Sequence, residues 1–159
     1  MKIIKYVIPT YKRYNILKNC TLAMLEHYKI PKKQIYIFVA DANELAEYKA
    51  VITDTGYNWV IGILGLKEQR NFITNYFKEG VPLLNIDDDI KSLFQLDASN
   101  KTLTPLNSLI ELVNKGFKDC IEHKAYLWGI CQVLNGYFMR DSTTFNFSFI
   151  VGHFWGCIH

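Results

Sequence analysis

In "LLNIDDDI", Leu83 to Ile90, a mostly apolar run ends in three consecutive aspartates, Asp87, Asp88 and Asp89. The segment "VPLLNI" has the apolar composition of a buried strand, so the carboxylates follow its carboxyl end. Adjacent carboxylates repel each other by about 1 to 4 kcal/mol, depending on the local dielectric constant. Such a cluster needs solvent, a cation or protonation, and a divalent metal ion meets that need most directly. An ordinary exposed acidic turn is the alternative interpretation.

The spacing within the triplet bears on metal binding. In an extended segment successive side chains alternate, so Asp87 and Asp89 are expected to point one way and Asp88 the other. Mg²⁺ and Mn²⁺ prefer oxygen ligands, usually one or two carboxylates together with the phosphates of a substrate. The pair of Asp87 and Asp89 is therefore the predicted site for Mn²⁺ or Mg²⁺.

Strand-like and helix-like segments alternate over the first two thirds of the chain. Predicted strands span residues 2–9, 34–41, 58–64 and 81–86, and predicted helices span 15–28, 44–52 (capped by Asn43) and 67–78. Apolar strands separated by helices indicate an α/β fold, with a mostly parallel sheet and helices on both faces. Ligands bind beyond the carboxyl ends of the strands in such sheets. That edge collects "PTYKR" (9–13), Asp41 and the aspartate triplet.

The last third has a different pattern. "IKSLFQL" (90–96) is typical of a strand, and Thr104 followed by Pro105 is typical of a helix cap and first helical position. The helix that follows, to about His123, is predicted to stack Leu109, Val113, Phe117, Cys120 and Ile121 on one side. From Tyr126 onward, "YLWGICQV", "NGYFMR", "FNFSFIVG" and "FWGCIH" are short, aromatic and β-prone, which predicts an antiparallel C-terminal extension.

Composition limits the class of protein. The chain has 159 residues, 50% of them hydrophobic and 14% aromatic, so we expect one globular domain over residues 1–159. No apolar run approaches the roughly 20 residues of a membrane helix, and no signal-peptide core is present, so we expect a cytoplasmic protein without membrane insertion. The four cysteines form no CxxC pair, which disfavours zinc sites and disulfides. Residues 1–33 hold eight Lys or Arg and one acid, Glu26, which permits an anionic ligand or only aids solubility.

Four segments, in this order, resemble the nucleotide-sugar-dependent glycosyltransferases of the GT-A fold, especially the large inverting family two. They are "VIPTYKR" (7–13), "IFVAD" (37–41), "GLKEQRN" (65–71) and "NIDDDI" (85–90). The third is similar to the family's Gly-x-x-x-x-Arg-Asn segment, and the fourth to its D-x-D motif. The resemblance implies a GT-A (Rossmann-like) fold and a metal-dependent, inverting hexosyltransferase.

The resemblance also implies a site for a nucleotide sugar donor, with a UDP-sugar as the first candidate. Residues 1–96 would form the donor and metal half, and residues 97–159 the acceptor side. The residues implied to hold the donor are Pro9, Thr10, Tyr11, Arg13, Asp41, Lys67, Arg70, Asn71, Asp87 and Asp88, with the metal ion on Asp87 and Asp89. Ordinary alternatives remain open: a turn or cap role for Asp41, loop closure for Thr10 and Tyr11, and surface positions for Lys67 and Arg70.

An inverting transfer needs a general base to take the proton of the acceptor hydroxyl. "GHFWGCIH" (152–159) resembles the family's strand before a Glu-Asp pair, but no such pair appears before His159. We therefore expect either another residue as the base or a shortened protein or fragment. Asp141, the predicted base, has turn capping as its alternative, and His153 and His159 are further candidates for a base or metal contact. Candidates for the border of an acceptor site, with core packing as the alternative, are Trp128, Gln132 and Trp155.

A narrower likeness concerns the acceptor. "IPTYKR" (8–13) and "DDDI" (87–90) also resemble the TET-associated glycosyltransferases of phages. This likeness implies a viral DNA-modification enzyme, which adds sugars to hydroxymethylated pyrimidines in the cytoplasm of a host cell. Two other functions stay open: a nucleotidyltransferase, although "IPTYKRYNIL" (8–17) lacks the usual Gly-rich phosphate loop, and a catalytically incomplete module that binds nucleotide sugars.

Overall fold

The structure, a computed structural model, describes residues 2–131, 133–146, 149–150 and 152–159. Its main element is a six-stranded sheet with the strand order β3-β2-β1-β4-β8-β7. Strands β1 to β4 pair in parallel, whereas β8 is antiparallel to both β4 and β7. This arrangement confirms the predicted mostly parallel sheet with an antiparallel C-terminal extension. The strands are β1 Lys5–Pro9, β2 Ile35–Val39, β3 Asn58–Ile61, β4 Pro82–Ile86, β7 Leu127–Gly129 and β8 Phe154–Ile158.

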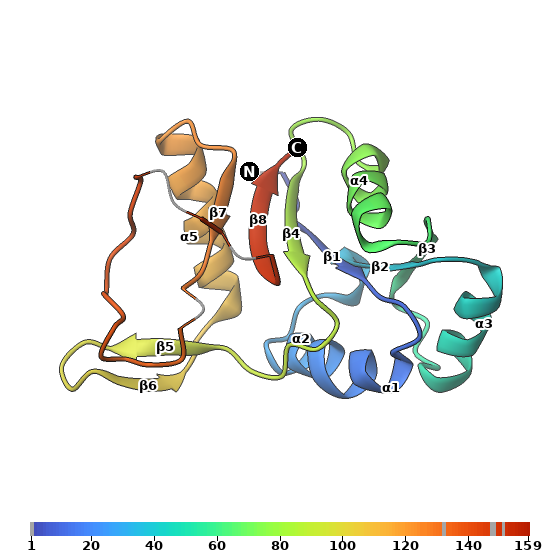
Figure 1. Ribbon diagram of the computed structural model, residues 1–159, viewed down its shortest axis with the longest axis horizontal. Coiled ribbons are helices and arrows are strands. Elements are labelled where there is room, and N and C mark those ends of the chain that lie inside the picture. The colour runs from blue at the N-terminus through green and yellow to red at the C-terminus, as the bar shows by residue number, and fades with distance from the viewer. Residues whose placement is uncertain (1, 132, 147–148, 151) are drawn as a thin grey trace.

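Helices cover both faces of the sheet, as predicted (Figure 1). In β1, Tyr6 and Ile8 point into the larger core cluster and Val7 into the smaller one, as strand alternation requires. Helix α4 (Leu66–Tyr76) packs on the Val7 face. The opposite face carries α1 (Tyr14–Leu17), η1 (Lys18–Leu22), α2 (Ala23–His27), α3 (Ala42–Val51) and α5 (Leu109–Glu122), and the short η2 (Lys32–Gln34) leads into β2. No helix in the described ranges has both the length and the apolar character of a membrane span.

The first predicted helix contains a π-helical segment. Residues 14–27 are helical, but η1 (Lys18–Leu22) has the wider π spacing and buries Cys20, Thr21 and Leu22 in succession. An α-helix would turn one of three consecutive side chains outward, whereas an inserted π turn shifts the buried face. Thr21, with 0% of its surface exposed, is thereby placed under the sheet edge that carries the aspartates.

The predicted start of helix α3 is wrong by two residues. Asp41 is the N-cap, because its Oδ1 accepts a hydrogen bond from the backbone N–H of Glu44 at 2.9 Å. Asn43, the predicted cap, lies inside the helix. Asp41 thereby satisfies one free N–H group of the first turn, while the Glu44 carboxylate accepts from the backbone N–H groups of Lys12 and Ala40, both at 2.6 Å.

The predicted start of helix α5 is also wrong. Thr104 and Pro105 end strand β6 (Thr102–Pro105), which pairs antiparallel with β5 (Phe94–Asp97) in a separate two-stranded sheet. The helix instead begins after Ser108, whose Oγ accepts from the backbone N–H of Glu111 at 3.2 Å. Pro105 lacks an N–H donor but fits the end of an edge strand, so the hairpin tolerates it.

The buried side of α5 matches the prediction in four of its five residues. Leu109, Val113, Phe117 and Cys120 are buried, whereas Ile121 is 58% exposed because it lies one step beyond the inward stripe. Two of the predicted C-terminal strands are present as β7 and β8. The described residues of "NGYFMR" (135–140) and "FNFSFIVG" (145–152) form no strand.

Tyr6 provides a test of packing around β1. Its side chain is 3% exposed, and burial raises its pKa from 10.0 to about 12. Because the folded-state pKa is the higher one, the stability from Tyr6 is fully present below pH 10 and is lost as the pH rises to 12. We expect the free energy of unfolding to fall over this interval, with Tyr6 supplying about 2 kcal/mol of the fall. Urea denaturation of the wild type and Tyr6→Phe across the interval measures this difference.

The matched control is Tyr137→Phe, which changes a tyrosine that is 79% exposed. Burial also raises the pKa of the Cys157 thiol to about 11, so the Tyr6→Phe variant should flatten the alkaline loss without abolishing it. Identical slopes for the wild type and Tyr6→Phe would contradict the assignment.

Candidate active site

The candidate site lies at the switch point of the sheet. Strand β1 has β2 on one side and β4 on the other, because the chain runs outward from β1 through β2 to β3 and then crosses back to form β4 beside β1. Open parallel sheets bind ligands at this point, beyond the carboxyl ends of the two central strands. Residues 10–13 follow β1 there, and residues 87–89 follow β4. The structure thus brings together the two segments that the sequence placed at one edge.

Asp88 is the buried member of the aspartate triplet, with 4% of its surface exposed. Its Oδ2 accepts from Thr10 Oγ1 at 2.7 Å, and its Oδ1 pairs with Arg13 Nη1 at 2.8 Å. Tyr48 of α3 bonds Thr10 Oγ1 at 2.5 Å and accepts from the backbone N–H of Arg13 at 3.0 Å. Burial raises the pKa of Asp88, and the bonds from Thr10 and Arg13 oppose the rise. Asp88 ties the acidic turn to the loop after β1, and its contact with a donor stays a prediction.

Asp89 lies on the open side of the turn. Its side chain is 48% exposed, and its Oδ2 accepts from Arg13 Nη2 at 2.9 Å. This bond is the main cause of the raised pKa of Arg13. Asp88 and Asp89 therefore reach the same guanidinium, and the expected strict alternation of the three side chains is wrong. The reason is that β4 ends at Ile86 and the chain turns at residues 88–89.

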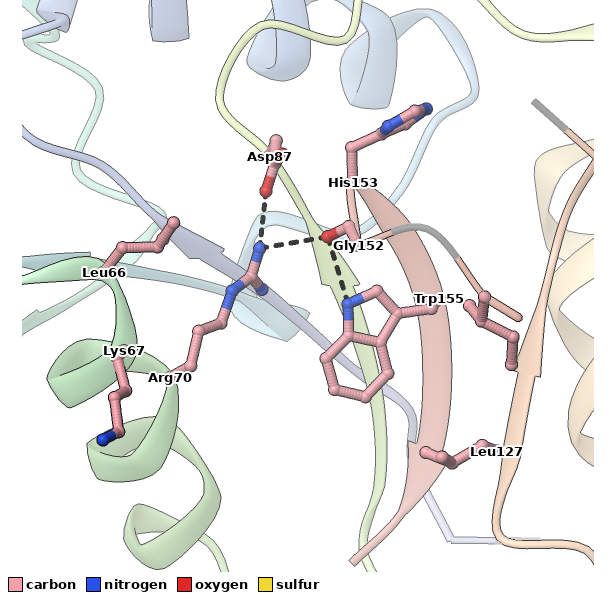
Figure 2. Close-up of a pocket in the computed structure, with 9 residues that line it drawn as sticks. Leu66, Lys67, Arg70, Asp87, Leu127, Gly152, His153 and Trp155 are labelled. Carbon is pink, nitrogen blue, oxygen red and sulfur yellow. Dashed lines mark hydrogen bonds and ion pairs between the residues drawn. The ribbon is translucent and has the colours of Figure 1, made fainter. Parts of the chain in front are cut away.

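Asp87 contacts a second arginine, Arg70 of α4, which Figure 2 shows pointing toward it. Arg70 Nη2 donates to Asp87 Oδ1 at 2.5 Å and to the carbonyl oxygen of Gly152 at 3.3 Å, while Nη1 donates to Asn85 Oδ1 at 3.1 Å. Burial raises the pKa of Asp87, Arg70 lowers it, and Asp89 raises it further. Burial also lowers the pKa of Arg70, which the Asp87 carboxylate opposes.

Buried polar residues that sequence reasoning missed hold this turn in place. Thr21 Oγ1 donates to the carbonyl oxygen of Asp87 at 2.6 Å and accepts from the backbone N–H of Ile90 at 3.0 Å. Tyr48 supports the loop after β1, and Asn85 holds Arg70. The available signal was a single polar residue within an apolar run, as in "VPLLNI" (81–86) for Asn85 and "CTLAML" (20–25) for Thr21.

A cavity of about 620 Å³ lies beside Asp87, between α4 and the strands β7 and β8. This volume falls within the range of small-molecule sites. Its lining includes three cationic or titratable side chains, Lys67, Arg70 and His153, and three apolar ones, Leu66, Leu127 and Trp155 (Figure 2). The indole Nε1 of Trp155 donates to the Gly152 carbonyl at 3.2 Å, which fixes this wall to the same oxygen that Arg70 contacts.

Other residues that were predicted to contact the nucleotide sugar lie outside this cavity. Asp41 caps α3, which is the alternative role that the sequence left open. Pro9 is the buried last residue of β1, and Tyr11 beside it is 46% exposed, with Lys12 Nζ 5.2 Å from its ring centre. Asn71 is exposed on α4. Their contacts with a nucleotide stay predictions.

The predicted acceptor-side residues separate into two groups. Trp155 and His153 line the cavity, whereas Trp128 packs in the core against Phe117 and Phe154, with ring centres 5.6 and 6.2 Å away. Asp141 is exposed in a loop and does not line the cavity. The backbone N–H of His159 donates to the carbonyl of Val81 at 3.2 Å. Gln132 lies outside the described residues.

The carboxylates suit a cation only in part. Among the residues that the structure describes, no group of three or more His, Cys, Asp or Glu side chains is placed to hold a metal ion. Asp89 raises the pKa of Asp87, so the two charges repel each other, and a cation between them would relieve that repulsion. Mg²⁺ and Mn²⁺ commonly bind one or two carboxylates together with phosphates and water. Asp87 and Asp89 supply that number of carboxylates, and their contact with a metal ion stays a prediction.

One solved structure with a similar fold is the mannosyltransferase PcManGT from Pyrobaculum calidifontis, in complex with GDP-Man and Mn²⁺. The TM-score is 0.57 at 11% sequence identity, and the similarity covers 98% of this chain and 44% of the mannosyltransferase chain. This chain thus spans less than half the length of that protein. No protein-family model and no curated protein matches the sequence. The likeness confirms the predicted α/β fold of the glycosyltransferase type.

Proposed function

We propose that this chain carries the donor-binding part of a metal-dependent glycosyltransferase, which moves a sugar from a nucleoside diphosphate sugar to an acceptor hydroxyl. The observation that carries the proposal is the meeting of Asp87 to Asp89 with Arg13 and Arg70 beyond β1 and β4. Arginines bind phosphates and carboxylates bind hard cations, so this set matches a diphosphate bridged to a metal ion. The fold shared with a mannosyltransferase solved with GDP-Man and Mn²⁺ supports the same interpretation.

Each charged residue has a task in this proposal. Asp87 and Asp89 hold Mn²⁺ or Mg²⁺, which supplies Lewis-acid stabilisation of the leaving diphosphate. Arg13 and Arg70 exchange part of their bonds to the carboxylates for bonds to the phosphates, and Lys67 adds a further positive charge at the cavity. Asp88 stays with Thr10 and keeps the turn in place.

We place the acceptor in the cavity, on the Arg70 side of the triplet. The favoured acceptor is a hydroxymethylated pyrimidine in DNA, as in viral DNA modification. Support comes from Trp155, whose aromatic face suits a base, and from the cation Lys67, which suits a backbone phosphate. His153 lines the cavity and Asp141 does not, so His153 is the first residue to test as the base of an inverting transfer.

We also propose one domain over residues 1–159, with the donor half in 1–96 and the acceptor side in 97–159. Support comes from β8, which joins the central sheet directly beside β4. The first donor to test is UDP-glucose, and the second is GDP-Man, the ligand of the structural neighbour.

A module that binds nucleotide sugars without turnover is the second candidate. The observation that favours it is the lining of the cavity in the described part of the chain, where Asp87 is the single carboxylate. That carboxylate is paired with Arg70 at 2.5 Å and is a metal ligand in the proposal above, so it is not free to act as the base. Transfer activity decides between the two candidates.

The proposal predicts metal-dependent binding of a nucleotide sugar. Titration calorimetry with UDP-glucose, GDP-Man and other donors, with and without Mn²⁺, is expected to find one donor whose affinity rises at least about tenfold with the metal. The cause is the bridge that the ion makes between the diphosphate and two carboxylates. A parallel assay follows donor hydrolysis and sugar transfer to hydroxymethylated DNA, with unmodified DNA as the control.

Absence of binding to every donor would contradict the proposal. Binding with no hydrolysis and no transfer would favour the binding module.

A further inference from the structure

Asn85 is a polar residue within the buried strand β4. All of β4 is buried, and Asn85 itself is 3% exposed. Burying an amide costs about 1 to 3 kcal/mol unless its polar atoms find hydrogen-bond partners. The backbone of β4 already pairs with β1 and β8, where Asn85 lies opposite Val7 and Trp155. The strand therefore has no need of an amide side chain, and the partners of this amide indicate its task.

The strong partner of Asn85 is Arg70. Asn85 Oδ1 accepts from Arg70 Nη1 at 3.1 Å, while Asn85 Nδ2 is 3.8 Å from Cys157 Sγ, a weak acceptor. The amide is thus directed at one guanidinium, which belongs to helix α4.

The guanidinium of Arg70 is held at three points. Besides Asn85, it contacts Asp87 and the Gly152 carbonyl, both through Nη2 (Figure 2). Asp87 and Gly152 lie just outside β4 and β8, where the chain turns, whereas Asn85 lies within the sheet. Fixing an arginine side chain costs about 2 kcal/mol of rotamer entropy, so an anchor inside the sheet lowers the cost of presenting it to a ligand.

We propose that Asn85 is a positioning residue, which holds the guanidinium of Arg70 in the orientation that binds a phosphate of the donor. This inference rests on the proposed function, because it assigns a donor phosphate to Arg70. The Nε–H and the second Nη1–H of Arg70 take no part in the three bonds above, and Arg70 lines the cavity. They are the donors that a phosphate would use.

A purely structural role for Asn85 and a positioning role predict different stabilities when Asn85 is replaced. On its face of the sheet, the smaller core cluster holds Val7, Phe38 and Leu83, so leucine at position 85 would join apolar neighbours. Leucine has nearly the shape of asparagine, and the Arg70 guanidinium is partly exposed and keeps its bonds to Asp87 and Gly152, so the replacement should cost little stability. Positioning therefore predicts unchanged stability with reduced affinity, and a structural role predicts reduced stability.

The test is a double-mutant cycle on ligand binding. Affinities for UDP and GDP with Mn²⁺, and for inorganic pyrophosphate, are measured on the wild type, Asn85→Leu, Arg70→Ala and the double variant. We expect Asn85→Leu to weaken binding about tenfold in the wild type and less than about twofold in the Arg70→Ala background. Melting temperatures of the wild type and Asn85→Leu should agree within about 2 °C. The matched control, Cys157→Ala, removes the other neighbour of the amide and should leave affinity unchanged.

Additive effects in the cycle would overturn the inference, because Asn85 would then act independently of Arg70. Unfolding of both Asn85→Leu and the smaller Asn85→Ala would overturn it as well, in favour of a strand role. Failure of the proposed function can be distinguished from failure of this inference. A wild type that binds pyrophosphate but no nucleotide contradicts the proposed function, and the double-mutant cycle can still be measured with pyrophosphate. A wild type that binds neither ligand overturns both.

Discussion

Asn in place of Asp89 is expected to lower the affinity for the donor in the presence of Mn²⁺ by about 100-fold, while the weaker binding without metal stays within about twofold. Removing a residue that hydrogen-bonds a metal ligand typically lowers metal affinity 10- to 100-fold. Loss of a direct carboxylate ligand should therefore reach the upper end of that range. Asp89 is half exposed and bonded only through Arg13 among its described contacts, so its loss leaves the fold intact. Arg13 keeps its second partner, Asp88, at 2.8 Å. Calorimetric titration with and without Mn²⁺ measures both affinities.

The control for this experiment is Asp54→Asn. Asp54 is another exposed aspartate paired with a cation, Lys32, and it lies in the turn before β3. This variant removes the same charge without touching the acidic turn, so both affinities should match the wild type. Metal-dependent binding that survives Asp89→Asn unchanged would remove the metal site from the proposal.

Gly156→Val is expected to destabilise the fold by about 3 kcal/mol or more, and to lower the melting temperature by about 10 °C. Gly156 lies in β8, and a Cβ atom there would fall directly on the indole nitrogen of Trp128. The indole is also close to α5, since a Cβ atom on Gly116 would lie 2.5 Å from Cδ2 of the ring. The clash would push β8 away from α5. Strand β8 pairs with β4, which is the strand that precedes the acidic turn. Thermal unfolding followed by circular dichroism measures the loss.

Gly152→Ala is the matched control for stability, because a Cβ atom there meets nothing within 4 Å. Its melting temperature should stay near that of the wild type. Trp128→Leu frees space next to position 156, so combining it with Gly156→Val should cost less than the sum of the two single changes. A Gly156→Val variant as stable as the wild type would show that Trp128 is not wedged between the two glycines.

Much of the site could be predicted from short segments, because parallel strands place their carboxyl ends at one edge. Residues 10–13 and 87–89 meet for that reason, and Arg70 joins them because α4 runs back along the sheet. The helix starts were harder to predict. Thr104–Pro105 has the local pattern of a helix cap, but these residues pair with β5 as part of a β-strand. The helix is capped instead by Ser108, which accepts from the backbone N–H of Glu111.

The roles within the triplet could not be predicted, because three identical and adjacent residues have the same local chemistry. Asp88 is buried under Thr10, Asp89 shares Arg13 on the open side, and Asp87 faces Arg70. The partners come from positions 17 to 78 residues away in the chain, and the turn after Ile86 abolishes the alternation of an extended strand.

By itself, the sequence determined the type of fold and the edge of the sheet that carries the charges. The physical reason is that the apolar periodicity of strands and helices, and the position of polar residues at strand ends, are local properties of the chain. The tertiary structure alone decided which aspartate is buried, that Asn85 and Thr21 support the site, and that Trp155 lines the cavity while Trp128 fills the core. These outcomes depend on burial and hydrogen bonding between distant segments, which exist only once the sheet has assembled.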